Sequence, residues 1–232
     1  MRKALIGGAA AVVLVAGSTA AAGTIMQTES FGPTTPDFSG TLTFDKFDDQ
    51  GGTLTLTGIK VKVQLDIDGG SAFADNDGVE PGTVDVEFGA TGSISSTDVT
   101  LLDGAFQPVT ADVDVLNLAT FNLTGHQGVD PIGTPEFEGD GDDDQIIGGP
   151  GSDMSMGFIN TAFYADYIGL DTFEIDFDVT TAFSISGASG VGGGFAPVIA
   201  SGNVMITYNF IPAPGVASLL GVAGLVAARR RR

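Results

Sequence analysis

The stretch Phe173-Glu174-Ile175-Asp176-Phe177-Asp178-Val179 alternates strictly between apolar residues and carboxylates. Successive side chains of a β-strand point to opposite faces of its sheet, so this period of two predicts a strand with one buried face. The aromatic and aliphatic residues belong to the core, and the carboxylates belong to the solvent side. This segment therefore predicts an all-β fold.

Similar alternation recurs along the chain. Leucines and threonines alternate over 53–57, and apolar residues resume at odd positions over 59–67, one residue out of phase. This change of phase at Thr57-Gly58 predicts a β-bulge or a strand break, because a slip of one residue exchanges the two faces. Further strands are expected at 83–88, at 113–121, which is apolar enough to be deeply buried, and at 204–210. Gly, Asp and Pro clusters separate these runs, which favours an antiparallel β-sandwich of the jelly-roll or Ig-like kind.

One long segment departs from this pattern. Residues 125–157 are rich in Gly, Pro and Asp and nearly free of alternation, so they form a candidate internal boundary. A helical turn is expected around Asn160 to Tyr167. No internal repeat of fixed period is found.

Composition excludes several classes of function. The 232 residues include 29 acidic and nine basic residues, and six of the basic ones lie at Arg2, Lys3 and 229–232. Residues 23–211 therefore carry three lysines against 29 carboxylates, a net charge of −26. Nucleic acid and anionic lipid both need cationic partners, so neither is expected to bind. The absence of cysteine excludes disulfides, thiolate metal sites and cysteine catalysis.

The first 22 residues predict a signal peptide with a helical apolar region. Arg2 and Lys3 precede an apolar run over 4–16, and Ala20-Ala21-Ala22 supplies the small residues that signal peptidase requires. Gly23 is the expected new N-terminus. Residues 23–211 are then an exported, acidic domain.

The last 21 residues, 212–232, predict a short membrane helix with a basic end. Pro212 and Pro214 set its N-terminal limit, since neither donates a backbone hydrogen bond. The thirteen residues 216–228 carry no charge, and the run becomes nineteen residues when it is extended back to Phe210. Crossing a bilayer takes about 20 apolar residues, so this run is barely long enough. The terminal cluster Arg229, Arg230, Arg231 and Arg232 is costly to translocate and is expected to stay in the cytoplasm.

This tail resembles the PEP-CTERM sorting signal of bacteria that make extracellular polysaccharide. Pro212, Pro214 and Gly215 match the frame of the motif, the terminal arginines match its basic end, and Ala213 replaces the usual Glu. The resemblance implies processing by an exosortase, a membrane-embedded cysteine protease. It implies a protein held transiently in the inner membrane and then delivered to the cell surface or extracellular matrix. An ordinary C-terminal membrane anchor is the alternative.

A second resemblance covers residues 38–210. The opening Leu42-Thr43-Phe44-Asp45-Lys46-Phe47-Asp48-Asp49-Gln50-Gly51-Gly52-Thr53-Leu54-Thr55 and the closing 202–210 strand are similar to the choice-of-anchor E family. Members of that family are attached to varied surface anchors, PEP-CTERM among them. The family brings no catalytic residues to carry over.

Calcium is the one cofactor that the sequence suggests. Ca²⁺ takes about six to eight oxygen ligands, which flexible Asp- and Gly-rich loops supply as carboxylates and carbonyls. Neither candidate segment has the spacing of an EF-hand, and solvated acidic turns are the alternative interpretation. The candidate ligands are Asp140, Asp142, Asp143, Asp144, Asp75 and Asp77.

Catalysis is not expected. His126 is the only histidine, no Gly-x-Ser-x-Gly elbow is present, and the chain has no Trp to stack a sugar. The sequence instead indicates a non-catalytic structural or interaction protein of the envelope or exopolysaccharide matrix. Its expected partners are signal peptidase, exosortase and extracellular polysaccharide. A Ca²⁺-dependent carbohydrate-binding, lectin-like module is the alternative, and a glycoside hydrolase is a more remote one.

Overall fold

A computed structural model of the protein describes residues 22–110, 112–126 and 144–213. Over these ranges the chain forms strands and one short 3₁₀ helix. In chain order the elements are β1 (Gly23–Thr34), β2 (Phe38–Asp45), β3 (Leu54–Asp68), β4 (Ser71–Asn76), β5 (Gly82–Ser95), β6 (Val113–Leu123), β7 (Asp144–Gly148), β8 (Gly151–Phe158), η1 (Thr161–Tyr167), β9 (Thr172–Gly187), β10 (Val191–Ala196) and β11 (Ile199–Pro212).

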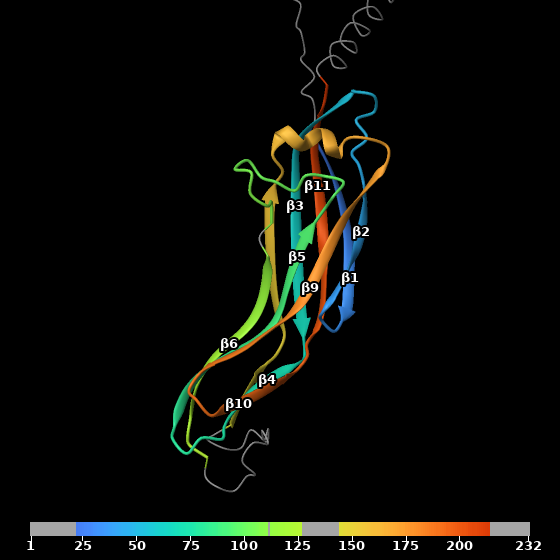
Figure 1. The fold of residues 1–232 in the computed structure, drawn as a ribbon. Helices are drawn as coiled ribbons and strands as arrows, with labels where there is room; N and C mark the ends of the chain where they lie inside the picture. Colours follow the sequence, from blue (N-terminus) through green and yellow to red (C-terminus); the bar gives the residue numbers. More distant parts are fainter. Residues whose placement is uncertain (1–21, 111, 127–143, 214–232) are drawn as a thin grey trace, which may run out of the picture.

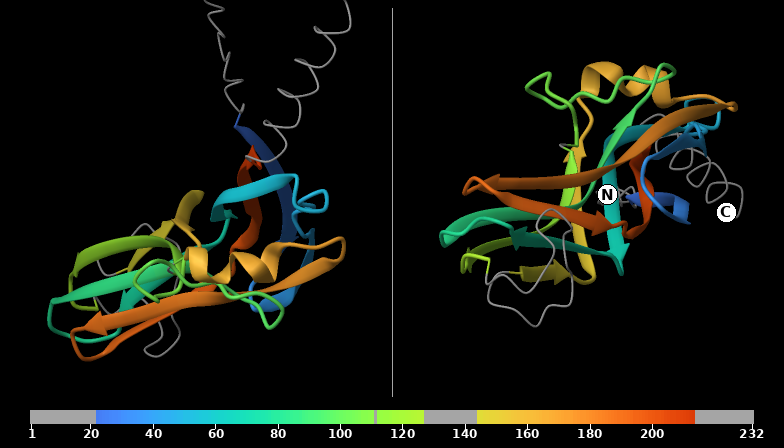
Figure 2. Two further views of the ribbon diagram at one scale, coloured as in Figure 1. Left: turned by 90° about the horizontal axis from the view of Figure 1, so that it is seen from above. Right: turned by 60° about the horizontal axis from the view of Figure 1, so that its bottom comes forward.

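The strands form three antiparallel sheets. The first sheet has the order β1-β11-β3-β8, and the second has the order β2-β9-β5-β6. These two sheets form two layers, with β3 contacting β5 and β6 across the interior (Figure 1). The small sheet, β10-β4-β7, lies at the lower end in Figure 1, where β9 and β5 curve away (Figure 2). The all-β antiparallel prediction is confirmed, and the layering is consistent with a β-sandwich.

A single apolar core lies between the layers, and β9 shows why it forms. Phe173, Ile175 and Val179 are completely buried, whereas the three carboxylates between Phe173 and Val179 are exposed. The apolar residues of this strand therefore face the core and its carboxylates face solvent, as the alternation predicts. In the first sheet, β3 supplies the matching inward row Ile59, Val61, Val63, Leu65 and Ile67.

The change of phase in β3 is a β-bulge. Asn209 of β11 pairs with Gly58, but the next residue, Phe210, pairs with Leu56. Thr57 is therefore the extra residue on β3, and the strand continues through it. The bulge keeps Leu56 and Ile59 on the buried side although they are three residues apart.

The expectation that 113–121 is deeply buried is wrong. β6 is an edge strand of the second sheet, and of its apolar residues Val113, Val115 and Leu123 are the buried ones. Leu118 is 68% exposed. The apolar content of β6 therefore overstates its burial, because only the inward side of an edge strand meets the core.

The candidate boundary at 125–157 is also wrong for the part that the structure describes. β7 pairs with β4, and β8 pairs with β3 along Gly151–Phe158. The sequence shows no alternation in β8 because its inward positions carry small residues. Gly157 is one of them, and a Cβ there would lie 2.1 Å from the carbonyl oxygen of Val109. Its outward positions carry Met154, Met156 and Phe158 instead.

The upper end of the molecule holds η1 and both described chain ends (Figure 1). The helical turn expected at Asn160 to Tyr167 is confirmed, with the Asn160 side chain accepting a hydrogen bond from the backbone N–H of Ala162 at 3.0 Å. Gly23 at the start of β1 pairs with Phe210 near the end of β11. The described chain therefore enters and leaves at the same place.

Candidate functional site

The outer surface of the second sheet carries rows of carboxylates flanked by hydroxyl groups. These residues occupy the outward positions of each strand, because the inward positions bury the apolar core. We call this surface the acid–hydroxyl face. It comprises Ser39, Thr41, Asp85, Glu87, Ser93, Ser95, Thr120, Asp176, Asp178, Ser184 and Ser186.

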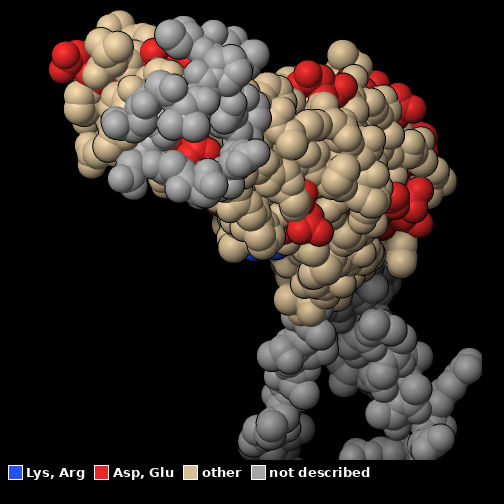
Figure 3. All heavy atoms as spheres, turned by 90° about the horizontal axis from the view of Figure 1, so that it is seen from below, with Lys and Arg blue, Asp and Glu red and all other residues tan. Residues whose placement is uncertain are grey.

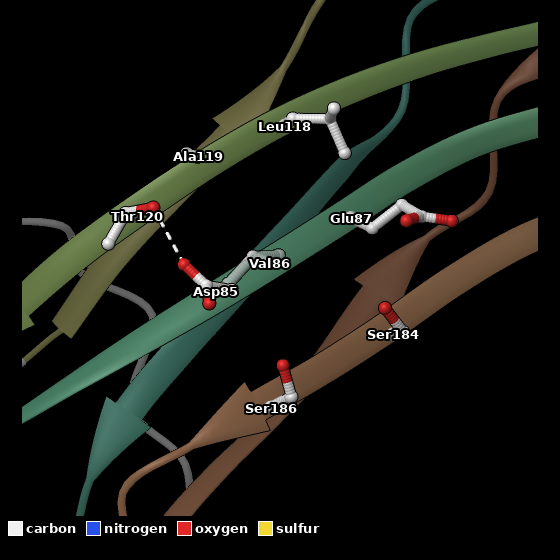
Figure 4. Close-up of a pocket in the computed structure, with 8 residues that line it drawn as sticks. All are labelled: Asp85, Val86, Glu87, Leu118, Ala119, Thr120, Ser184 and Ser186. Carbon is white, nitrogen blue, oxygen red and sulfur yellow. Dashed lines mark hydrogen bonds between the residues drawn. The ribbon is translucent and has the colours of Figure 1, made fainter.

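One hollow of about 370 Å³ lies across β6, β5 and β9 (Figure 4). Asp85 of β5 pairs with Thr120 of β6 on one side and Ser186 of β9 on the other. The Thr120 hydroxyl donates a 2.6 Å hydrogen bond to Asp85. Glu87 lies in the next row, opposite Ser184, so two carboxylates share one open, hydroxyl-lined hollow.

A second hollow of about 270 Å³ lies across β2, β9 and β5 and repeats this arrangement. Asp178 pairs with Ser39 and Ser93, and the neighbouring Asp176 pairs with Thr41 and Ser95. The Thr41 hydroxyl donates to Asp176 at 2.8 Å. Each carboxylate of this part of β9 is thus flanked by hydroxyls on both adjacent strands.

This arrangement suits hydrogen bonding to a polyhydroxylated or cationic ligand. Carboxylates accept hydrogen bonds, and Ser and Thr hydroxyls both donate and accept, so together they complement sugar hydroxyls. The uncompensated negative charge disfavours an anionic ligand. Viewed from below, Asp and Glu form several separate patches and almost no basic atoms are visible (Figure 3).

The ion pair that the structure describes lies away from this face. Lys46 Nζ contacts Asp171 Oδ2 at 3.1 Å in the loops at the upper end. The hydrogen bond from Lys46 holds the pKa of the Asp171 carboxyl below its usual range. Since Lys60 and Lys62 lie on β3 in the other sheet, no lysine of the described ranges neutralises the acid–hydroxyl face.

The structure places two of the predicted calcium ligands together. Asp75 of β4 and Asp144 of β7 are direct cross-strand partners, and both are buried. Asp77 follows β4 directly. Asp140, Asp142 and Asp143 lie outside the described residues, and within the described ranges no group of three His, Cys, Asp or Glu is placed to hold a metal ion. The calcium site stays a prediction.

Most of the predicted sorting signal lies beyond the described residues. Pro212 is the last residue of β11 and pairs with Leu54, so the final strand extends beyond the predicted 204–210 into the first residue of the predicted signal. Pro214, Gly215 and Arg229–Arg232 lie outside the described residues. Among residues 22–110, 112–126 and 144–213, no helix is long and apolar enough to span a membrane.

The serines and threonines of the acid–hydroxyl face are not predicted as site residues from the sequence. Their signal is the period-two spacing in Ser93-Ile94-Ser95 and Ser184-Ile185-Ser186, which matches that of the carboxylates. That β5 and β2 flank β9 on either side is information that only the strand order supplies.

Comparison with known proteins places the chain in no family. No protein-family model and no curated protein matches it. Among solved structures, a VP2 subviral particle of infectious bursal disease virus aligns at 14% identity with a TM-score of 0.14, over 97% of this chain and 54% of the viral one. T=1 particles derived from the same virus align at 12% identity with a TM-score of 0.12, over 89% and 48%. The chain thus spans about half of each viral chain, and likeness at this level carries no argument.

Proposed function

We propose that this is an exported, non-catalytic structural or interaction protein of the bacterial envelope or exopolysaccharide matrix, delivered by a C-terminal sorting signal that an exosortase processes. Signal peptidase and exosortase act on its two ends, and the inner membrane holds it before processing. The signal helix, the short membrane helix and a jelly-roll or Ig-like assignment are parts of this proposal.

The observation that carries the proposal is the pairing of Gly23 with Phe210. Gly23 is the expected N-terminus after signal cleavage, and Phe210 lies two residues before the Pro212-Ala213-Pro214 motif. Both processing sites are then adjacent at one end of a long domain. A protein tethered there projects its sheet faces away from the membrane, which suits an interaction surface.

Analysis of the protein taken from its native cells tests this proposal. Intact mass and terminal peptides should show loss of residues 1–22 and of the tail beyond the Pro212 region, with the protein in the surface or matrix fraction. Retention of Arg229 to Arg232 in a membrane fraction would instead establish an ordinary anchor, and the sorting proposal would fail.

A Ca²⁺-dependent carbohydrate-binding module is the second candidate, favoured by the acid–hydroxyl face. Its hydroxyl-flanked carboxylates match the hydrogen-bonding needs of a neutral polysaccharide. Retention of the full chain on immobilised polysaccharide, with calcium and then with chelator, tests this function. Replacing Asp176 and Asp178 together by Ala should abolish retention, whereas the matched pair Glu29 and Asp153, which are exposed and belong to the first sheet, should tolerate Ala. An equal loss of retention in both double variants would mean that the overall negative charge, and not the acid–hydroxyl face, causes the binding.

A further inference from the structure

The methionines gather on one surface. The chain has five, and apart from Met1 all lie at outward positions of the first sheet: Met26 on β1, Met205 on β11, and Met154 and Met156 on β8. Phe158 continues the β8 row. Exposure reaches 60% for Met26, 52% for Met154, 48% for Met156 and 61% for Phe158. Flexible, polarizable methionines clustered in the open are typical of interaction surfaces rather than of cores.

The same surface holds two of the three lysines of residues 23–213. Lys60 pairs with Phe158, and Lys62 pairs with Met156 on one side and Met205 on the other. We call this surface the Met/Lys face. The carboxylates among its outward residues on β3 are Asp66 and Asp68, which balance the two lysines, so this part of the face is close to neutral in a domain whose net charge is −26.

The central column of the Met/Lys face is complementary to itself. Outward residues of β3 run in the order Lys60, Lys62, Gln64, Asp66, Asp68, positive at one end and negative at the other, with Lys62 donating to Gln64 at 3.1 Å and Gln64 donating to Asp66 at 3.2 Å. When two such columns face each other in antiparallel fashion about a two-fold axis above Val63, Lys60 of each meets Asp66 of the other. Lys62 of each then meets Gln64.

The flanking column on β8 fits the same symmetry. Met154 lies beside Gln64 and Met156 beside Lys62, so the two-fold axis brings Met154 of one copy onto Met156 of the other. The methionine pair thus lies beside the column in which charges meet opposite charges, while Phe158 of each copy meets Ser152 of the other. A two-fold interface uses one patch on both partners and needs this kind of self-complementarity.

We propose that the Met/Lys face binds the same face of a second copy of this chain, giving a two-fold dimer through the first sheet. The dimer leaves the acid–hydroxyl faces of both copies exposed on opposite sides. Four strands about 4.8 Å apart, each contributing seven residues of about 3.3 Å, give a flat area of about 400 Å². Because specific interfaces bury about 800 Å² per partner, this dimer is expected to be weak and concentration-dependent. Its existence does not depend on the proposed sorting.

Sedimentation of the full-length chain in detergent, over a range of protein and salt concentrations, tests the dimer. Association should strengthen from 10 mM to 150 mM salt, because the Debye length falls from about 30 Å to about 8 Å and screens the mutual repulsion of two acidic domains. Met156→Glu should weaken association at least tenfold, since each copy then presents a carboxylate to the partner's methionine. Leu118→Glu is the matched control, because it makes the same change at an exposed apolar residue of the other sheet and should leave association unchanged.

A charge exchange tests the geometry itself. Lys60→Asp alone should weaken the dimer, because it sets a carboxylate against Asp66, and Lys60→Asp combined with Asp66→Lys should restore it. A wild-type chain that stays monomeric in all conditions would overturn the proposal. So would a dimer that survives Met156→Glu, which would place association in the apolar tail, or a double exchange that fails to rescue.

Discussion

The two ends of the molecule are stabilised by different kinds of contact. At the upper end, which we call the aromatic end, Tyr167 and Phe44 lie against Phe173 with ring centroids 5.4 and 5.7 Å away, and Phe47 lies 5.8 Å from Tyr208. Both tyrosine hydroxyls donate to backbone carbonyls, Tyr167 to Thr100 at 2.9 Å and Tyr208 to Asp45 at 3.1 Å. Large buried rings with satisfied hydroxyls therefore hold this end together.

The small sheet at the lower end, which we call the glycine–acid end, contains few large buried side chains. A Cβ on Gly193 would lie 2.5 Å from the Phe73 carbonyl oxygen, so strands β10 and β4 approach closely only because glycine stands there. Its buried residues include the polar Asp75, Asn76 and Asp144. The comparison teaches that one end depends on apolar area and the other on backbone proximity and satisfied polar groups.

The largest expected effect is loss of a ring at the aromatic end. Phe173→Ala removes a completely buried ring that contacts two others and should lower the free energy of unfolding by about 3–5 kcal/mol. The same change at Phe195, which is 41% exposed at the glycine–acid end, should cost only about 1 kcal/mol. Urea unfolding of both variants measures the difference, and equal losses would contradict the contrast between the ends.

Alkaline pH should also lower the free energy of unfolding, through the two buried tyrosines of the aromatic end. Burial raises the pKa of Tyr167, with further contributions from Tyr208 and Asp166, and burial likewise raises the pKa of Tyr208. The unfolded chain loses phenol protons near pH 10 while the folded chain keeps them, so stability is complete below pH 10 and falls as pH rises. Each tyrosine should contribute a loss of about 1.4 kcal/mol per pH unit above pH 10.

Urea unfolding between pH 8 and 11.5 measures this slope. Tyr208→Phe should reduce the slope because it leaves one fewer buried phenol. Phenolate absorbance of Tyr167 and Tyr208 that appears before the chain unfolds would contradict the prediction.

A smaller effect is expected from the polar interior of the glycine–acid end. The Asn76 amide donates to the carbonyls of Glu80 at 3.0 Å and Thr124 at 2.7 Å, and its oxygen accepts from the N–H of Gly78 at 3.0 Å. Asn76→Ala removes the buried amide that makes these three hydrogen bonds and should cost about 1–3 kcal/mol in thermal or urea unfolding. The exposed Asn122, bonded to the Thr83 hydroxyl, is the control, and Asn122→Ala should cost less than about 1 kcal/mol.

Sequence reasoning succeeds where strands have one clean phase and a fully buried face. The alternation in β9, the shifted phase in β3 and the final strand β11 all identify real strands and their inward residues. Each lies within its sheet rather than at an edge, so every apolar residue of one phase meets the core. The carboxylate half of the acid–hydroxyl face follows from the same phase.

Sequence reasoning fails where the hydrophobic residues of a strand are not its buried residues. In β8 the inward positions include Gly151 and Gly157 because Val115 and Val109 come too close for a side chain, while methionine and phenylalanine point outward. In β6 the exposed Leu118 makes an edge strand look buried. The pairing of Asp75 with Asp144 depends on strands 69 residues apart in the chain, which no local pattern reveals.

Calcium should give the smallest of these effects, and only at the glycine–acid end. Asp75 and Asp144 are direct cross-strand partners, so a cation bound there would take carboxylate oxygens from both strands. At a calcium concentration of about ten times its dissociation constant, one site adds about 1.4 kcal/mol to the free energy of unfolding. Thermal unfolding of the full chain in calcium, in magnesium and in chelator at constant ionic strength measures this increment. Asp75→Asn should remove it, whereas Asp85→Asn on the acid–hydroxyl face should retain it. An equal response to magnesium, or loss of the response in both variants, would mean that the acidic segments are solvated turns and that the two ends do not differ in metal binding.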